Sequence, residues 1–186
     1  MVLLAGAAAA LTSLLVFLLP SVAAARGVGV RADHVFHRIA GSGARFSCDR
    51  RQAWYGALGV ADRRERRWFV LPVFCREANW FHQHQAAAYS RESFRQALAL
   101  LVMTHESIHL SRAFPGAADE ARTECLAIQL VHGVAIGLGA SEEVARAIGH
   151  ESIRYHERLP KVYHHSGCRD GGPLDIHPGL GDWPNA

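Results

Sequence analysis

The sequence predicts a single α+β domain that is dominated by helices. Three segments of the second half repeat apolar residues at helical spacing, whereas the first half holds short β-prone runs. The 186 residues are 49% hydrophobic and 20% charged, which is typical of one globular domain of ordinary size. We therefore expect a small sheet packed against the first two of these helices.

The first 25 residues carry no charge and end in Ala23-Ala24-Ala25, directly before Arg26. An apolar run that closes in small residues is typical of a cleaved signal peptide. The same run is long enough to span a bilayer and has no basic residue ahead of it, which leaves a retained membrane anchor as the alternative. In both cases residues 26–186 are predicted to form one extracytoplasmic domain, either secreted or anchored to the cell membrane.

The chain has four cysteines, Cys48, Cys75, Cys125 and Cys168. An even number of cysteines in a short exported chain indicates disulfides. Of the three possible pairings we favour Cys48–Cys75 with Cys125–Cys168, because each bond would link neighbouring segments. Free buried thiols in a cytosolic protein are the alternative. No C-x-x-C pair is present, which argues against a zinc site built from cysteines.

The sequence of the first half of the domain predicts short secondary-structure elements. Residues 34–48 read as two extended runs around the Gly41-Ser42-Gly43 turn, and residues 51–61 as a short helix. The basic run at residues 63–67 is interpreted as a solvated turn or loop, with a patch that contacts an anionic surface as the alternative. A net charge of +3 is only mildly basic and gives no indication of a nucleic-acid partner.

Residues 68–75, with the sequence WFVLPVFC, are β-prone, and Pro72 suits an edge strand better than a central one. Such an edge strand is able to pair with a peptide substrate. Residues 76–88 are predicted to be helical. We interpret His82 and His84 as surface or hydrogen-bonded histidines rather than metal ligands.

Three helices are expected in the second half. The first begins after Ser90, a good N-cap, and runs to residue 110. The second covers about residues 117–134, and the third is opened by Ser141 and runs to about residue 158. The tail from about residue 160 contains four prolines and five glycines, so we expect an irregular strap.

The first of these helices contains the motif H-E-x-x-H as His105-Glu106-Ser107-Ile108-His109. Residues four apart lie on one face of a helix, so both imidazoles can reach a single Zn²⁺ ion. Glu106, beside the first ligand, is then the candidate general base. The chain has 12 histidines, which raises the chance of an accidental match, so the surroundings of the motif matter.

The second helix supplies acidic residues that need an explanation. Glu120 and Glu124 are one turn apart in a segment that is otherwise rich in Leu, Ile and Val. Glu120 is the candidate third zinc ligand, and Glu124 the candidate acceptor for the free N–H of a ligating histidine. The alternative is that Glu124 itself is the ligand. A further alternative is a hydrogen-bonded cluster that holds no metal.

This arrangement resembles the gluzincin-type zinc metallopeptidases, in which H-E-x-x-H is followed by Glu-x-x-x-Asp-x-x-Ala on the next helix. Here the pattern reads His105-Glu106-x-x-His109 and Glu120-x-x-x-Glu124-x-x-Ala127, and it covers about residues 100–130. The resemblance implies Zn²⁺ held by His105, His109 and Glu120, Glu106 as general base, and a peptide or protein substrate. Two departures are the Glu at 124, where Asp is commoner, and the short connection of ten residues before Glu120. The T-H-E-x-x-H and T-E-C pair is also similar to small exported actinobacterial proteins of unassigned function.

A peptidase also needs a donor for the oxyanion of its tetrahedral intermediate. His150, Tyr155 and His156 on the third helix are the candidates, followed by Tyr163, His164 and His165 in the strap.

The sequence as a whole predicts an exported zinc-dependent metallopeptidase-like hydrolase. The alternative is a non-catalytic, disulfide-stabilised envelope or membrane-anchored binding module with a degenerate or structural metal site.

Overall fold

The computed structural model describes residues 30–49, 57–84, 93–114, 118–178 and 183–184. The predicted signal peptide or anchor at residues 1–25 lies outside them. Within these ranges the α-helices are α1 (Val30–Ala40), α2 (Pro72–Gln83), α3 (Ser93–Leu110), α4 (Glu120–Gly137) and α5 (Glu142–His156), followed by the 3-10 turn η3 (Lys161–Tyr163). The strands are β1 (Arg45–Cys48), β2 (Gly59–Asp62) and β3 (Arg67–Val70). The predicted helix-dominated α+β class is confirmed.

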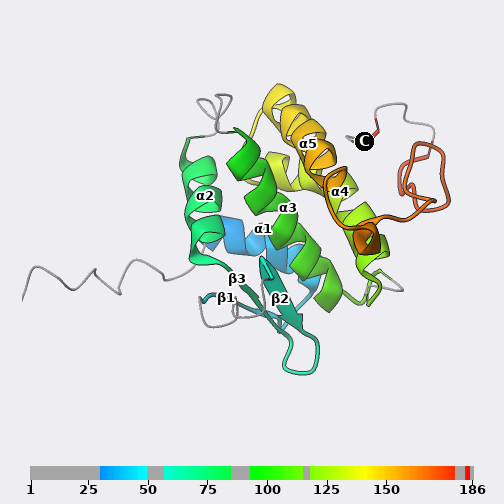
Figure 1. Ribbon diagram of the computed structural model, residues 1–186. Helices are drawn as coiled ribbons and strands as arrows, with labels where there is room; N and C mark the ends of the chain where they lie inside the picture. The colour runs from blue at the N-terminus through cyan, green and yellow to red at the C-terminus, as the bar shows by residue number, and fades with distance from the viewer. Residues whose placement is uncertain (1–29, 50–56, 85–92, 115–117, 179–182, 185–186) are drawn as a thin grey trace, which may run out of the picture.

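Helix α3 is the centre of the molecule. It contacts α1, α2, α4, α5 and two strands, and the sheet lies across one end of the helical layer (Figure 1). Every residue from Ala99 to Leu110 is buried, as expected for a helix with packing partners on all sides. The hydroxyls of Thr104 and Ser107 are satisfied in this apolar setting by donating to backbone carbonyls one turn earlier, both at 2.7 Å.

The sheet has the strand order β1-β3-β2, with β1 parallel and β2 antiparallel to β3. Trp68 and Val70 of β3 are buried, and Phe36 and Phe46 pack on the Trp68 ring. Residues 68–70 lie in strand β3, as the β-prone run predicts, but the expected edge position and the extension to residue 75 were wrong, because β3 is central and ends before Pro72. That proline instead occupies the first turn of α2, where its missing N–H costs nothing. The edge strand beside α3 is β2.

Two other predictions in the first half were wrong. Residues 34–40 form the end of α1 rather than a strand, because Ala32, Val35, Phe36 and Ala40 are buried at helical spacing. Gly41, with φ of +84°, ends this helix in the left-handed conformation that glycine adopts without strain. The helix predicted at residues 51–61 falls partly outside the described residues, and its last three residues lie in β2.

The helices of the second half match their predictions closely. Asp119 accepts a hydrogen bond from the backbone N–H of Arg122 at 3.0 Å, so α4 begins three residues later than expected. Ser141 caps α5 as predicted, accepting from the N–H of Val144 at 3.3 Å. In the part of the chain that the structure describes, no helix has the length and apolarity needed to cross a membrane.

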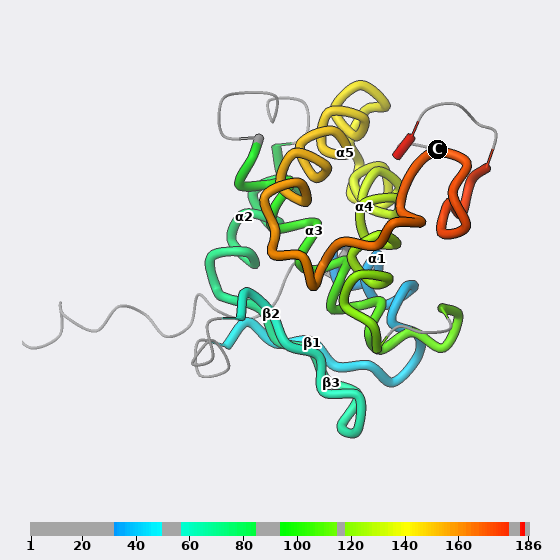
Figure 2. Tube along the Cα trace, turned by 45° about the vertical axis from the view of Figure 1, so that its right-hand side comes forward, coloured from blue at the N-terminus to red at the C-terminus, as the bar shows by residue number. Residues whose placement is uncertain are grey.

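The C-terminal strap is irregular, as predicted, and is fastened along α4. It leaves the end of α5, forms η3 and continues beside α4 (Figure 2). Both predicted disulfides are present: Cys48–Cys75 ties β1 to α2, and Cys125–Cys168 ties α4 to the strap. The buried Gln129 amide adds two hydrogen bonds to the strap backbone, at 2.9 and 2.8 Å. These disulfides are compatible with an extracytoplasmic location.

Removal of the second disulfide is expected to destabilise the fold substantially. In the Cys125→Ala/Cys168→Ala double variant, the unfolded chain regains the freedom of a loop whose ends are 43 residues apart. Loop-closure entropy of this size corresponds to about 4 kcal/mol in the free energy of unfolding. Denaturant titration followed by circular dichroism measures it. A loss below about 1 kcal/mol would contradict the expectation, since removing a native disulfide normally costs about 2–5 kcal/mol.

Candidate metal centre

Three side chains from α3 and α4 meet at one point. His105 and His109 are one helical turn apart on α3, and their Nε2 atoms are 3.0 Å from each other. Oε2 of Glu120, from the first turn of α4, lies 3.0 Å from Nε2 of His105 and 3.4 Å from Nε2 of His109. These three residues form a group that could hold a metal ion. The structure thus brings together the three ligands that the sequence predicts.

The spacing of the three atoms fits a small divalent cation. Ligands bound tetrahedrally to Zn²⁺ at 2.0–2.1 Å lie about 3.3 Å from one another. The observed separations of 3.0, 3.0 and 3.4 Å are close to that value. Two imidazole nitrogens and one carboxylate oxygen are also the donor types that zinc takes in open sites, where a fourth position remains for water.

The hydrogen bonding of His105 supplies a second reason for a cation. Its Nδ1 lies 2.7 Å from Oε2 of Glu124, so the imidazole donates from Nδ1 to this carboxylate. A neutral His105 then presents the lone pair of Nε2 to Glu120, whose carboxylate oxygen is also an acceptor. Two acceptors at 3.0 Å require a proton or a cation between them.

The alternative to a metal is protonation of His105. Burial lowers the pKa of this imidazole, but the hydrogen bonds to Glu120 and Glu124 outweigh burial and raise the pKa to about 10 in the metal-free chain. The hydrogen bond from His105 in turn lowers the pKa of Glu120. The carboxylates therefore stabilise positive charge at this point, whether a proton or a metal ion carries it.

Glu124 contacts His105 from outside the group of three atoms. It is 3% exposed, and its Oε2 contacts the far nitrogen of the His105 ring. Its other oxygen is 3.8 Å from Nδ1 of His156. Burial raises the pKa of the Glu124 carboxyl, but the neighbouring His105 and His156 outweigh burial and lower it. The geometry therefore favours Glu120 over Glu124 as the third ligand.

Glu106 is buried beside the ligands and faces the edge strand. A Cβ atom placed on Gly59 would lie 2.7 Å from both Cγ and Oε1 of Glu106, so this carboxyl fits against a strand backbone without a side chain. Burial raises the pKa of Glu106 to about 7, opposed in part by His105. A carboxyl with a pKa near the ambient pH is suited to act as a general base.

These groups open into one cavity of about 610 Å³, a volume typical of ligand sites. Its wall includes the three possible ligands and Glu106, the β2 backbone, and apolar side chains of α3 such as Leu101 and Val102. Tyr155 of α5 and Tyr163 of η3 also line the wall. The Tyr163 ring lies edge-on to the ring of His105, with centroids 6.1 Å apart.

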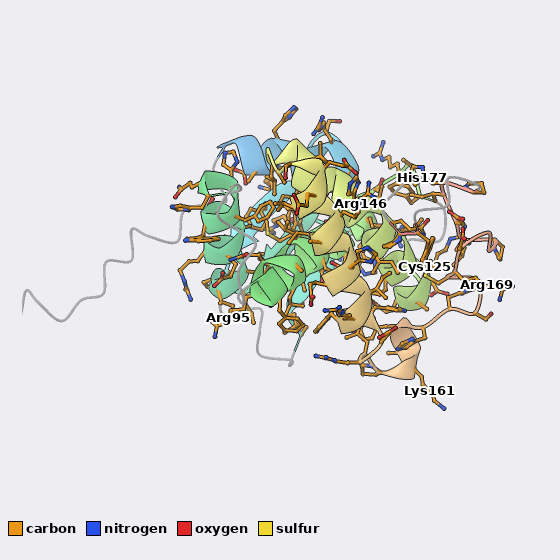
Figure 3. The ribbon with its side chains drawn as sticks, turned by 90° about the horizontal axis from the view of Figure 1, so that it is seen from above. Arg95, Cys125, Arg146, Lys161, Arg169 and His177 are labelled. Carbon is orange, nitrogen blue, oxygen red and sulfur yellow. A yellow bond between two sulfur atoms is a disulfide. The ribbon has the colours of Figure 1, made fainter. Side chains whose placement is uncertain are left out.

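Of the three oxyanion donors predicted on α5, one lies in the cavity wall and two do not. Tyr155 lies in the cavity wall, whereas His156 contacts Glu124 from behind the ligands. His150 is exposed on the outer face of α5, in a groove shared with Arg146, which Figure 3 labels on that helix. The prediction that His150 and His156 face the site is therefore not supported by the geometry. His82 and His84 are hydrogen-bonded to backbone carbonyls, as predicted.

Sequence reasoning missed two residues of this cavity, Gly59 and Arg63, and named a third, Tyr163, as a secondary candidate. Tyr163 was ranked below the candidates on α5. Cys168, five residues later, could have indicated its position, because a disulfide to Cys125 of α4 brings the strap close to His105, His109 and Glu120. Gly59 lay in a predicted helix, and Arg63 in a predicted solvated turn. Their positions follow from the pairing of β2 with β3, which a short run of small residues does not reveal.

Comparison with protein-family models, with curated proteins and with solved structures gives no match for this chain. The motif residues and their geometry in this chain are therefore what indicates a metal centre.

Proposed function

We propose that the chain is an exported zinc-dependent hydrolase of the metallopeptidase type. One observation carries the proposal: Nε2 of His105, Nε2 of His109 and Oε2 of Glu120 converge within 3.4 Å, with the buried Glu106 beside them in a cavity. The resemblance of the two helical motifs to gluzincins supports the same conclusion. The two disulfides support the extracytoplasmic location.

The residues of the site have distinct tasks. His105, His109 and Glu120 would hold Zn²⁺, which when bound acidifies water and polarises the carbonyl of the scissile bond. Glu106 accepts the proton of the attacking water at its carboxylate and passes it to the departing amine nitrogen. Glu124 accepts the Nδ1–H of His105, which keeps the imidazole in the tautomer that ligates through Nε2.

The cavity also offers groups for the oxyanion and for the substrate chain. Tyr155 and Tyr163 carry the hydroxyl donors of the wall, and burial raises the pKa of both phenols, so they are protonated at neutral pH. A protonated phenol donates a hydrogen bond to a developing oxyanion. Strand β2 lines the cavity and pairs with β3 on one side only within the described ranges, so a peptide is able to add to its other edge.

The test combines metal analysis with hydrolysis by the purified full chain. We expect about one Zn²⁺ per chain, hydrolysis of an equimolar synthetic peptide library, and loss of hydrolysis when a chelator removes the metal. Stoichiometric zinc without hydrolysis would favour the non-catalytic binding module. Absence of metal, with a thermal stability that does not respond to chelator, would favour the hydrogen-bonded cluster in which His105 is protonated.

The contact between Gly59 and Glu106 leads to a further prediction. In Gly59→Ala the new Cβ, at 2.7 Å from the Glu106 carboxyl, forces this side chain to move, whereas the metal ligands are untouched. Displacement of a catalytic group by about 1 Å costs on the order of 100-fold in rate. We therefore expect kcat/KM to fall by about 100-fold, with zinc content unchanged.

The control is Gly133→Ala on α4, where an added Cβ meets nothing within 4 Å. Alanine in a helix is favoured over glycine, so this variant is expected to be fully active and slightly more stable. Equal activity of Gly59→Ala and wild type would contradict the role given to this glycine.

A further inference from the structure

The arginines of the basic run at residues 63–67 make different contacts. Arg66 donates from Nη2 to two backbone carbonyls of the turn between α1 and β1, both at 3.1 Å. Arg67 pairs with Glu65 at 3.0 Å. These two arginines are therefore engaged within the fold, whereas Arg63 and Arg64 form no hydrogen bond or ion pair with another described residue.

Arg63 differs from Arg64 in position. Both side chains are exposed, but Arg63 lines the cavity of the candidate metal centre and Arg64 does not. Among the described residues that line this cavity, Arg63 is the sole Arg or Lys, and no described residue forms a hydrogen bond or ion pair with its guanidinium. Lys161, on the strap nearby, points away from the helices in Figure 3 and is not part of the wall.

The distance from Arg63 to the reacting groups is set by β2. Gly59 lies against Glu106, and Arg63 follows four residues later, directly after the last residue of the strand. At about 3.3 Å per residue, the two backbone positions are about 13 Å apart. An extended peptide beside β2 covers this distance in about four residues.

We propose that Arg63 binds a carboxylate of the substrate, so that preferred peptides are apolar near the scissile bond and acidic about three to four residues away, a spacing set by the strand rise. This inference rests on the proposed function. The apolar preference follows from Val60, Leu101 and Val102 in the wall. The acidic preference follows from the planar guanidinium, which accommodates a carboxylate through two parallel hydrogen bonds.

The experiment measures binding apart from hydrolysis. The probe is an equimolar library of Ala/Leu octapeptides in which one position is scanned with Glu, Gln or Lys, each made with a free and with an amidated C-terminus. The full-length, zinc-loaded Glu106→Gln protein is incubated with the library, and the retained peptides are counted by mass spectrometry. We expect about tenfold enrichment of Glu over Gln at one or two adjacent positions.

Two charge reversals test the residue. Arg63→Glu is expected to abolish the enrichment of Glu peptides and to favour Lys peptides, whereas the matched neighbour Arg64→Glu retains the wild-type preference. Both side chains are exposed, so the fold is expected to tolerate either change. Enrichment confined to peptides with a free C-terminus assigns the carboxylate to the chain end, and enrichment that includes amidated peptides assigns it to an acidic side chain.

Equal retention of Glu and Gln peptides, retention of no peptide, or a preference that survives Arg63→Glu overturns the inference. The proposed function is tested separately, through cleavage of the same library by the wild-type chain. Charge-selective retention without cleavage supports the role of Arg63 and contradicts the hydrolase. Cleavage without charge selectivity supports the hydrolase and contradicts the role of Arg63.

Discussion

Replacing Glu106 with Gln is expected to eliminate hydrolysis and to leave the metal in place. Gln has the shape of Glu and fits the same pocket against Gly59, but it cannot accept the proton of the attacking water. The metal ligands are other side chains, so about one Zn²⁺ per chain should remain. We expect kcat/KM to fall by about 10²–10⁴-fold, the usual contribution of a general base. Peptide cleavage and metal analysis of the same sample measure both effects.

The same variant makes a prediction about stability. Burial raises the pKa of Glu106 from its ordinary value of 4.5 to about 7. An acid whose pKa rises on folding destabilises the folded state progressively as the pH rises between these two values, and fully above the higher one. At pH 8 the metal-free Glu106→Gln protein should therefore resist denaturant better than the metal-free wild type, and at pH 4 this advantage should vanish because both side chains are neutral. A less stable variant at pH 8 would show that the carboxylate has a structural partner.

The matched control is Glu151→Gln on α5. Glu151 pairs with Arg154 on the surface and lies outside the cavity wall, so its replacement should change neither activity nor metal content. Retention of full activity by Glu106→Gln would exclude Glu106 as the base.

Replacing His105 with Ala is expected to remove the metal. The variant loses one of three ligands and also leaves Glu124 buried without its 2.7 Å partner. In the wild type, zinc at 100 times its dissociation constant raises the free energy of unfolding by about 2.7 kcal/mol. In the variant this zinc-dependent gain should be absent. Denaturant titrations with zinc and with chelator, together with metal analysis, measure the difference.

Because an unpartnered buried Glu124 destabilises the fold by itself, a second variant is needed. His109→Ala removes a ligand and leaves the His105–Glu124 hydrogen bond intact, so it should fold and still lose the zinc-dependent gain. The control is His132→Ala, since His132 is as buried as His109 but pairs with Glu142 away from the cavity. Stoichiometric zinc in both His105→Ala and His109→Ala would refute the ligand assignment.

The helices of the second half could be predicted because the features that specify them lie close together in the sequence. Helix spacing through α3, the Ser141 cap and the run of Gly and Pro in the strap each depend on neighbouring residues. The β elements were harder to read, because a short strand is stabilised by partners distant in sequence. Residues 59–61 form a strand only because they pair with β3, and residues 34–40 form a helix because apolar positions that begin at Ala32 face α3 and α4.

The sequence by itself determined the chemistry that this chain is able to offer. The helical spacing of His105 and His109, with Glu106 between them and two glutamates on the next helix, defines a possible metal centre without knowledge of the packing. Only the tertiary structure decided that Glu120 lies beside the Nε2 atoms of both histidines whereas Glu124 contacts Nδ1 of His105. It also decided that Tyr155 and Tyr163 line the cavity whereas His150 does not, and that Arg63 stands at its edge. Ligand spacing within one helix is local geometry, whereas the angle between α3 and α4, the course of the strap and the register of β2 result from long-range packing.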